Sequence, residues 1–434
     1  MNHTSLSTTP THMATWSNRQ DRYLEDTHSR ASAIALQPRL PVEIFILIIS
    51  QIHSSKDLSR LIAVSRLFRA ITEPEIYRDM RINTPSIDPR RIAVSTNKRL
   101  NAMFRSLRDP HLGSHIIVFR IRLDHHWHCP VVAVPRADTL PGWCCVELDV
   151  ELGGVVTNLP NLQTLSFYCQ LKHTSYIPMH TWLTNVKSAH FCELEMDCGY
   201  HKWQIADLHL LRAPCFSTLQ ALNLDTGPPD HRPSEEFLLL LEEKNQFLPA
   251  IDTLAYNDVA LGTWIVSNRP IKKIVGINNE GPTSLPDHLT KTLIKNGRKK
   301  LDLLYGWDIQ YWLPEQNPTP YLNLTSLGSI TVTQDLLETN ILQFTEVLSF
   351  LKCLKWIEFA FSSSSYLPDF WSDQLFLRLD MQHPLLTKIY LVVRIPYIQG
   401  ATSPAFLYEK TEVGWRKRSA RFLTYWEVAT GPGC

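Results

Sequence analysis

The chain has 434 residues, of which 44% are hydrophobic and 20% charged, an ordinary composition for a folded protein of two or three domains. Its 43 basic and 42 acidic side chains give a formal net charge of +1, so the composition offers no overall field for nucleic acid or an anionic membrane. Only 16 residues are glycine, which argues against glycine-rich phosphate loops as an organising feature.

Residues 1–35 are rich in Ser, Thr, His and Asn and have no apolar period, so we expect a disordered N-terminal arm. The arm lacks the basic and apolar regions of a secretory signal, and no segment of the chain reaches the roughly 18 apolar residues that span a bilayer. The nine scattered cysteines are typical of reduced thiols. We therefore expect a protein of the cytoplasm, the nucleus or both, with no membrane partner.

Residues 36–82 predict three short helices. Pro41 suits the first position of the first helix, because its missing N–H would be unpaired there. Ser54 and Asp57 form a capping box for a second helix, which we expect to reach Phe68. A second box at 72–75 predicts the start of a third helix.

The first of these helices is apolar almost all round. Ile44, Ile48 and Ile52 form one stripe, and Phe45 and other apolar residues fill the remaining faces. Such a helix must be buried on all sides, yet three helices of about 40 residues make too small a core to do this alone. Either the rest of the chain or a second protein must cover the helix.

The same region resembles an F-box. The resemblance rests on Leu40-Pro41-Val42-Glu43-Ile44, on Asp57-Leu58 and on Val64-Ser65-Arg66-Leu67-Phe68, in that order. The sequence departs from the family pattern in having Phe68 where Trp is frequent, and His53-Ser54-Ser55-Lys56 where many members have a Leu-Pro turn. The resemblance implies docking on a Skp adaptor, which links such proteins to a cullin–RING ubiquitin ligase. The residues that it implies for this docking are Leu40, Pro41, Ile44, Ile48, Leu58, Val64 and Phe68.

Residues 83–111 are expected to form a linker and a helix whose basic side chains are solvated, an acidic partner being the alternative. From Ile116 onward, within a domain predicted at 112–400, the pattern apolar-x-x-apolar-x-apolar recurs, as at Leu162/Leu165/Phe167 and Cys145/Leu148/Val150. The pattern resembles a leucine-rich repeat (LRR), in which each unit contributes a short strand to one face. The predicted fold class is thus α/β, a three-helix F-box followed by an irregular LRR-like α/β solenoid, with an irregular α+β domain as the alternative.

Strand alternation identifies candidate target-binding residues. Side chains between the apolar positions of each strand point away from the core, and in such an array they line a surface that could bind a target protein. The substrate-binding candidates are Tyr168, Asn223, Asp225, Asn257, Glu358 and Tyr390. Ordinary solvated strand positions are the alternative.

Residues 401–434 interleave basic and aromatic side chains, such as Trp415-Arg416-Lys417-Arg418. Such a pattern can bind single-stranded nucleic acid by stacking, but we favour a helix or strand that caps the array, and we expect no nucleic-acid partner.

The sequence contains none of the common phosphate-loop, metalloprotease or serine-hydrolase motifs. One cluster, His125-His126-Trp127-His128-Cys129 with Cys144-Cys145, resembles a metal site, but neighbouring residues of a strand point apart and so converge poorly on one ion. We predict no metal, no cofactor and no catalysis. The preferred hypothesis is the substrate-recognition subunit of an SCF-type (Skp–cullin–F-box) ubiquitin ligase; a plain binding scaffold and an enzyme built on the histidine cluster are the alternatives.

Overall fold

The computed structural model describes residues 40–52, 54–83, 102–123, 145–169, 181–197, 213–225, 247–256, 262, 265–266, 269–276, 301–305, 321–332, 348–361, 373–393, 405–420 and 425–430. The chain divides into two compact units, Met1–Glu75 and Ile76–Cys434. The expected N-terminal arm lies outside the described residues.

The first unit is helical and contains α2 (Val42–Ser50), α3 (Ser55–Ile62) and most of α4 (Arg66–Tyr77). Ser54 caps α3 by accepting a hydrogen bond from the Asp57 N–H at 3.3 Å, which confirms the capping box predicted there. The Ser65 hydroxyl accepts from the Phe68 N–H at 3.2 Å in the same way at the start of α4.

The predicted boundaries of the second and third helices were wrong. α3 ends at Ile62 instead of reaching Phe68, because Ser65 caps a new helix. α4 then runs through the predicted second box: Thr72 is buried inside the helix, and Pro74 lies in its last turn. The start signal of α4 was therefore Ser65, whose hydroxyl accepts from Phe68. The predicted box that contains Pro74 does not start a helix.

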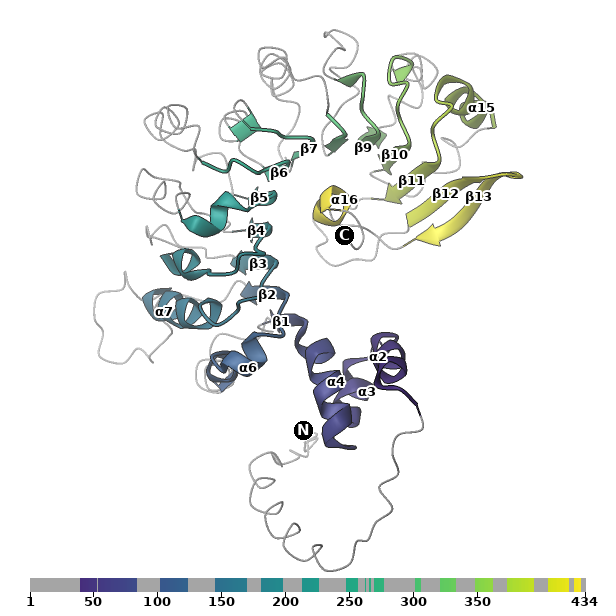
Figure 1. Ribbon diagram of the computed structural model, residues 1–434. Helices are drawn as coiled ribbons and strands as arrows, with labels where there is room; N and C mark the ends of the chain where they lie inside the picture. The colour runs from purple at the N-terminus through teal and green to yellow at the C-terminus, as the bar shows by residue number, and fades with distance from the viewer. Residues whose placement is uncertain are drawn as a thin grey trace, which may run out of the picture. The chain divides into compact units, whose positions relative to one another are not determined.

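The second unit contains a sheet of 13 strands arranged in chain order (Figure 1). Strands β1 to β11 pair in parallel, and β12 and β13 add an antiparallel hairpin at the end. The strands are β1 Asp79–Asn83, β2 Val118–Leu123, β3 Thr164–Cys169, β4 Glu193–Asp197, β5 Ala221–Asp225, β6 Thr253–Tyr256, β7 Lys273–Gly276, β8 Leu303–Tyr305, β9 Ser326–Val332, β10 Trp356–Phe361, β11 Lys388–Val393, β12 Ala405–Thr411 and β13 Gly414–Ala420. The chain is thus α/β, with N-terminal helices followed by a mixed sheet.

The parallel strands enter the sheet in the same way each time. The residue just before each strand from β3 to β11 donates its backbone N–H to the carbonyl at the corresponding position of the preceding strand, over 2.7–3.0 Å. This series of bonds begins with Gln163 bonded to Ile117 and ends with Thr387 bonded to Lys355. The equivalent residues therefore stack in register along this part of the sheet.

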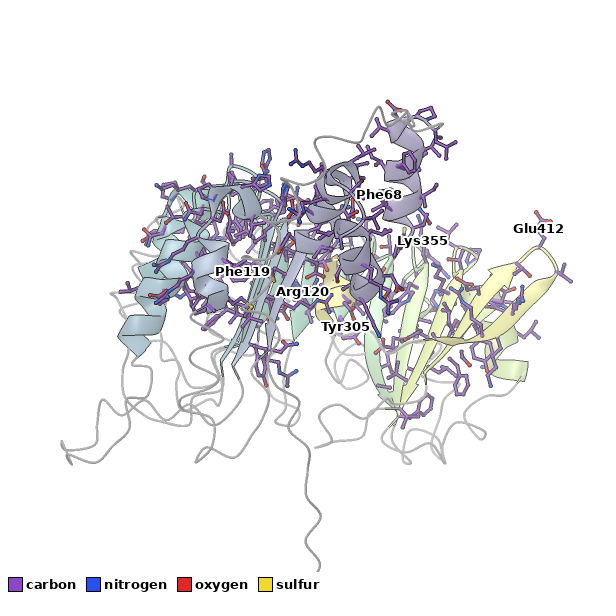
Figure 2. All side chains as sticks on the ribbon, turned by 90° about the horizontal axis from the view of Figure 1, so that it is seen from below. Phe68, Phe119, Arg120, Tyr305, Lys355 and Glu412 are labelled. Carbon is purple, nitrogen blue, oxygen red and sulfur yellow. The ribbon has the colours of Figure 1, made fainter. Side chains whose placement is uncertain are left out.

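One face of the sheet carries the main hydrophobic core. Leu162, Leu165 and Phe167 are buried there, as the apolar pattern predicted. Phe119 lies in this core, whereas its neighbour Arg120 points to the opposite face (Figure 2). The pattern at 145–150 was misleading, because these residues lie in helix α7 (Cys145–Val156).

The helical segments divide between the two sides of the sheet. α7 and α15 (Asp373–Gln382) lie on one side and α16 (Tyr425–Thr430) on the other (Figure 1). The short helices α6 (Pro110–Gly113), η2 (Thr181–Asn185) and η4 (Pro214–Ser217) lead toward strands. At the C-terminal end of the sheet, the last strand in the order is β13. Among the described residues, no helix has the length and apolar character needed to cross a membrane.

Candidate interaction surfaces

The first candidate surface is the apolar exterior of α2 and the turn that follows α3. Ile44 is 38% exposed, Ile48 51% and Leu47 61%, while Ile49 is the one apolar residue of α2 that is fully buried. Leu40 and Val64 are exposed to a similar degree. Large aliphatic side chains gathered on one small unit in this way are typical of a protein-binding site.

The residues predicted to bind the adaptor fall into two groups. Leu40, Pro41, Ile44, Ile48 and Val64 are exposed and available for contact. Leu58 is buried and Phe68 half-buried, with the ring of Phe68 packed edge-on against Phe45 at 5.5 Å between centroids. The structure thus places these two inside the unit, where they support the exposed group.

Comparison with known protein families agrees with this arrangement. A family model described as F-box-like matches residues 37–83. The chain carries an F-box-like domain. F-box domains are protein-interaction modules rather than catalytic ones, so this domain gives the protein a role in protein interaction. No curated protein matches the chain.

The second candidate surface is the sheet face opposite the main core, which we name the α16 face. A row of residues runs across the middle of this face, with one residue from each strand paired with the next from β1 to β8. The row continues with a paired residue on β10 and on β11. The residues of this row are Arg81, Arg120, Ser166, Glu195, Asn223, Ala255, Val275, Tyr305, Glu358 and Tyr390. The face is thus basic on β1 and β2, acidic on β4, and built of small or apolar side chains from β6 to β8.

At the basic end of the α16 face, the carboxylate of Asp79 pairs with two arginines. Arg81 forms a bidentate contact with Asp79, at 2.6 Å for the shortest pair, and Arg120 approaches the same carboxylate at 3.8 Å. The hydrogen bonds and charge of Asp79 raise the pKa of Arg81, and the charge of Glu427 in α16 adds to this effect. Arg122 covers the ring of Tyr168 at 4.8 Å from its centroid.

Two carboxylates of the acidic strand β4 accept hydrogen bonds from side chains of β3. Ser166 donates a hydrogen bond to Glu195 at 2.8 Å, and Thr164 donates to Glu193 at 2.9 Å. Burial raises the pKa of Glu195, and the hydrogen bond from Ser166 only partly opposes this shift.

The predicted target-binding residues differ in accessibility. Tyr168 is half-buried beneath Arg122. Asn223, Glu358 and Tyr390 point away from the main core, as strand alternation predicts, but they are enclosed, with exposed fractions of 6%, 0% and 2%. Asp225 ends β5, with its side chain outside the description, and Asn257 lies outside the described residues. A role for these six in target binding stays a prediction.

Neighbouring side chains account for the unexpected burial. Glu358 accepts a hydrogen bond from the Tyr305 hydroxyl at 2.7 Å, across the intervening strand β9. Gly328 of β9 makes this bridge feasible, because a Cβ there would lie 2.5 Å from the Tyr305 ring. Tyr390 packs in a small cluster with Val392 and Leu407. Alternation gave the direction of these side chains, but it carried no information on what covers them.

α16 fills the middle of the α16 face, and sequence reasoning missed this contact. Trp426 and Ala429 are buried in a cluster with Ala221, Ala255 and Val275 of the sheet. The Trp426 indole N–H donates to Glu193 at 2.5 Å, and Lys273 donates to the Ala429 carbonyl at 3.0 Å. The one available signal was the pair of small residues Ala221 and Ala255, which face away from the main core on β5 and β6.

The metal-like cluster at 125–129 lies outside the described residues. Within the described part of the chain, no group of three or more His, Cys, Asp or Glu side chains could hold a metal ion.

Proposed function

We propose that the protein is the substrate-recognition subunit of an SCF-type ubiquitin ligase, docking on a Skp adaptor through its F-box-like domain. The observation that carries the proposal is the exposure of Leu40, Ile44, Ile48 and Val64 in a domain of that family. F-box domains generally bind Skp adaptors, and apolar anchors of this kind supply most of the energy of a protein interface.

The second unit is proposed to be an irregular LRR-like solenoid that binds the target protein. Two observations support this: strands β1 to β11 follow chain order in parallel, and the residues that precede β3 to β11 form a repeating series of backbone hydrogen bonds. Each repeat of a solenoid packs only on its neighbours and leaves an extended surface for binding.

The proposed mechanism is proximity rather than chemistry by this chain. Holding a target beside a ubiquitin-charged enzyme raises the effective concentration of the reacting groups. The chain itself then needs no catalytic residue or cofactor. We propose a location in the cytoplasm, the nucleus or both, where the ubiquitin machinery operates.

A matched pair of substitutions tests the adaptor interface. Val64 in the F-box-like domain and Val150 in α7 are each 63% exposed. Val64→Asp places a charge in the proposed interface, which we expect to abolish co-purification with the Skp adaptor, as should joint replacement of Leu40, Pro41 and Ile44 by Ala. Val150→Asp makes the same chemical change elsewhere and should leave co-purification intact. Equal capture of wild type and the Val64→Asp variant would overturn the proposal.

A binding scaffold without a ligase role is the second candidate function. The two functions differ in whether the exposed apolar side chains of the F-box-like domain need a partner to cover them. If the F-box-like domain serves only this chain, the protein should be soluble and monomeric when expressed alone. If the apolar surface of α2 needs a partner, soluble yield should depend on co-expression with the Skp adaptor.

A further inference from the structure

The sheet is shaped to receive a helix where α16 lies. On β5, β6 and β7 the apolar side chains clustered with α16 are Ala221, Ala255 and Val275, whereas β10 and β11 carry the large Trp356 and Tyr390 on the same face. Small side chains let a helix backbone approach a sheet closely. We name this stretch of the α16 face, on which Trp426 and Ala429 pack, the seat.

α16 engages the seat through a few distinct chemical groups. Glu193 uses both carboxylate oxygens, one accepting from the Trp426 indole and the other from Thr164. Lys273 reaches the carbonyl of Ala429 in the last turn of the helix, where a cation is favoured. Glu427, next to Trp426, has its charge within range of Arg81 on β1.

The helix itself is too short to persist without the seat. α16 has six residues, and isolated helices of that length are not stable in water. Its folding and its docking are therefore one event, and undocking releases a flexible segment. Such an element has two states, docked and released, and any competitor for the seat biases the balance between them.

One polar atom beside α16 has no hydrogen-bond partner among the described residues. Asn223 lies between Glu195 and Ala255 in the strand register and is buried. Its side-chain oxygen accepts no hydrogen bond within the described part of the chain. A buried acceptor without a donor is costly, so a ligand that supplies the donor gains an interaction that the described side chains of α16 do not make.

We propose that α16 is an internal competitor for the target site, and that the target presents a short helix with a tryptophan-like anchor, an acidic residue next to it and a small residue three positions after the anchor. This inference rests on the proposed function, because it places target binding on the α16 face. A donor side chain on the target, paired with Asn223, would favour the target over the chain's own segment.

Peptide exchange on the full-length protein tests the proposal. The probe is a fluorescent peptide of residues 421–433, and its binding is followed by anisotropy. The full-length Trp426→Ala variant, whose own helix has lost its anchor, should bind the peptide. Wild type should bind it at least about tenfold more weakly, because its tethered copy competes at high effective concentration.

Peptide variants define the recognised chemistry. A peptide carrying Trp426→Ala should lose about tenfold or more in affinity, and one carrying Glu427→Lys should bind more weakly, with a loss that shrinks at high salt. Val150→Asp in the Trp426→Ala chain serves as the control. It should leave the affinity for this peptide within about threefold, because Val150 lies in α7, on the other side of the sheet from α16.

Hydrogen exchange covers the case in which the Trp426→Ala variant fails to fold. In wild type, amides of α16 should exchange well before those of β6 and β7, since docking is reversible. Exchange of α16 as slow as that of the strands, no peptide binding by a folded variant, or equal binding by variant and wild type would overturn the inference. Skp capture by the same proteins tests the adaptor role separately, so the two proposals can fail independently.

Discussion

Single residues determine how side chains pack on the α16 face, and Gly328 is the clearest case. A Cβ at this position would lie 2.5 Å from the ring of Tyr305 and 2.9 Å from that of Trp356. These two rings stack at 6.2 Å between centroids, and Tyr305 also bonds Glu358. The absence of a side chain at Gly328 is therefore a packing requirement of its two aromatic neighbours.

Gly328→Ala should destabilise the sheet by about 1–3 kcal/mol, because the added methyl overpacks the site and displaces Tyr305. Urea denaturation followed by tryptophan fluorescence measures this, with Trp356 as a reporter at the site. Ser326→Ala in the same strand is the control and should stay within about 0.5 kcal/mol of wild type. A neutral effect of Gly328→Ala would mean that the rings move without cost.

Glu195 gives the sheet a dependence on pH. Burial raises the pKa of this carboxyl above its ordinary value of 4.5, so the folded state favours the protonated form. Protonated Glu195 contributes to the free energy of unfolding. This contribution is fully present below the ordinary pKa and is lost as the pH rises through the raised pKa of the folded state.

Glu195→Gln should therefore gain stability relative to wild type between about pH 4 and about pH 7, since glutamine has no charge to bury and keeps an oxygen for Ser166. The difference in unfolding free energy between variant and wild type, measured at both pH values, checks this. A difference that does not change with pH would show that Glu195 titrates normally in the folded protein.

At the scale of elements, helix starts rest on single hydrogen bonds. Ser54→Ala removes the acceptor for the Asp57 N–H and should destabilise α3 by about 1 kcal/mol. Hydrogen exchange of α3 amides in the full-length protein should then be about fivefold faster. Ser59→Ala, in the middle of the same helix, should not accelerate exchange, because alanine is the better helix former.

The apolar spacing predicted strands where each supplied several large residues, as at Leu354/Ile357/Phe359 in β10. Among the parallel strands it missed β1, and it placed a strand at Val186/Ala189/Phe191, before the observed β4. It also missed β7 and β8, which are short and end in Gly276 and Tyr305. It also mistook a turn of α7 for a strand, because a spacing of three and two occurs by chance in a chain this apolar.

The F-box-like domain could be predicted because its motif residues are nearly contiguous in sequence and its first helix is apolar on every face. The contact of α16 with the sheet could not be predicted, because the bond from Trp426 to Glu193 joins residues 233 positions apart. No local pattern encodes such a pairing; it depends on how many strands separate the two residues and how the sheet is built between them.

At the scale of the whole molecule, the net charge of +1 hides a separation of charge. Arg81, Arg120 and Arg122 lie on two adjacent strands, and Glu193 and Glu195 lie on β4. The composition correctly excludes a global field, yet a ligand on the α16 face meets a basic end and an acidic strand. Specificity for a target helix would come from matching this order of charges.

The order of the strands has one more consequence. From β2 to β11 each strand bonds only to the strands before and after it in the chain. Inserting or deleting one strand together with its loop therefore leaves the order and the connections of the other strands unchanged. Evolution can therefore change the length of such a sheet by duplication or loss of single units. The packing of α16 on β6 and β7 would then limit growth between β7 and β13, because a unit added there changes the separation between the end of β13 and the place where α16 docks.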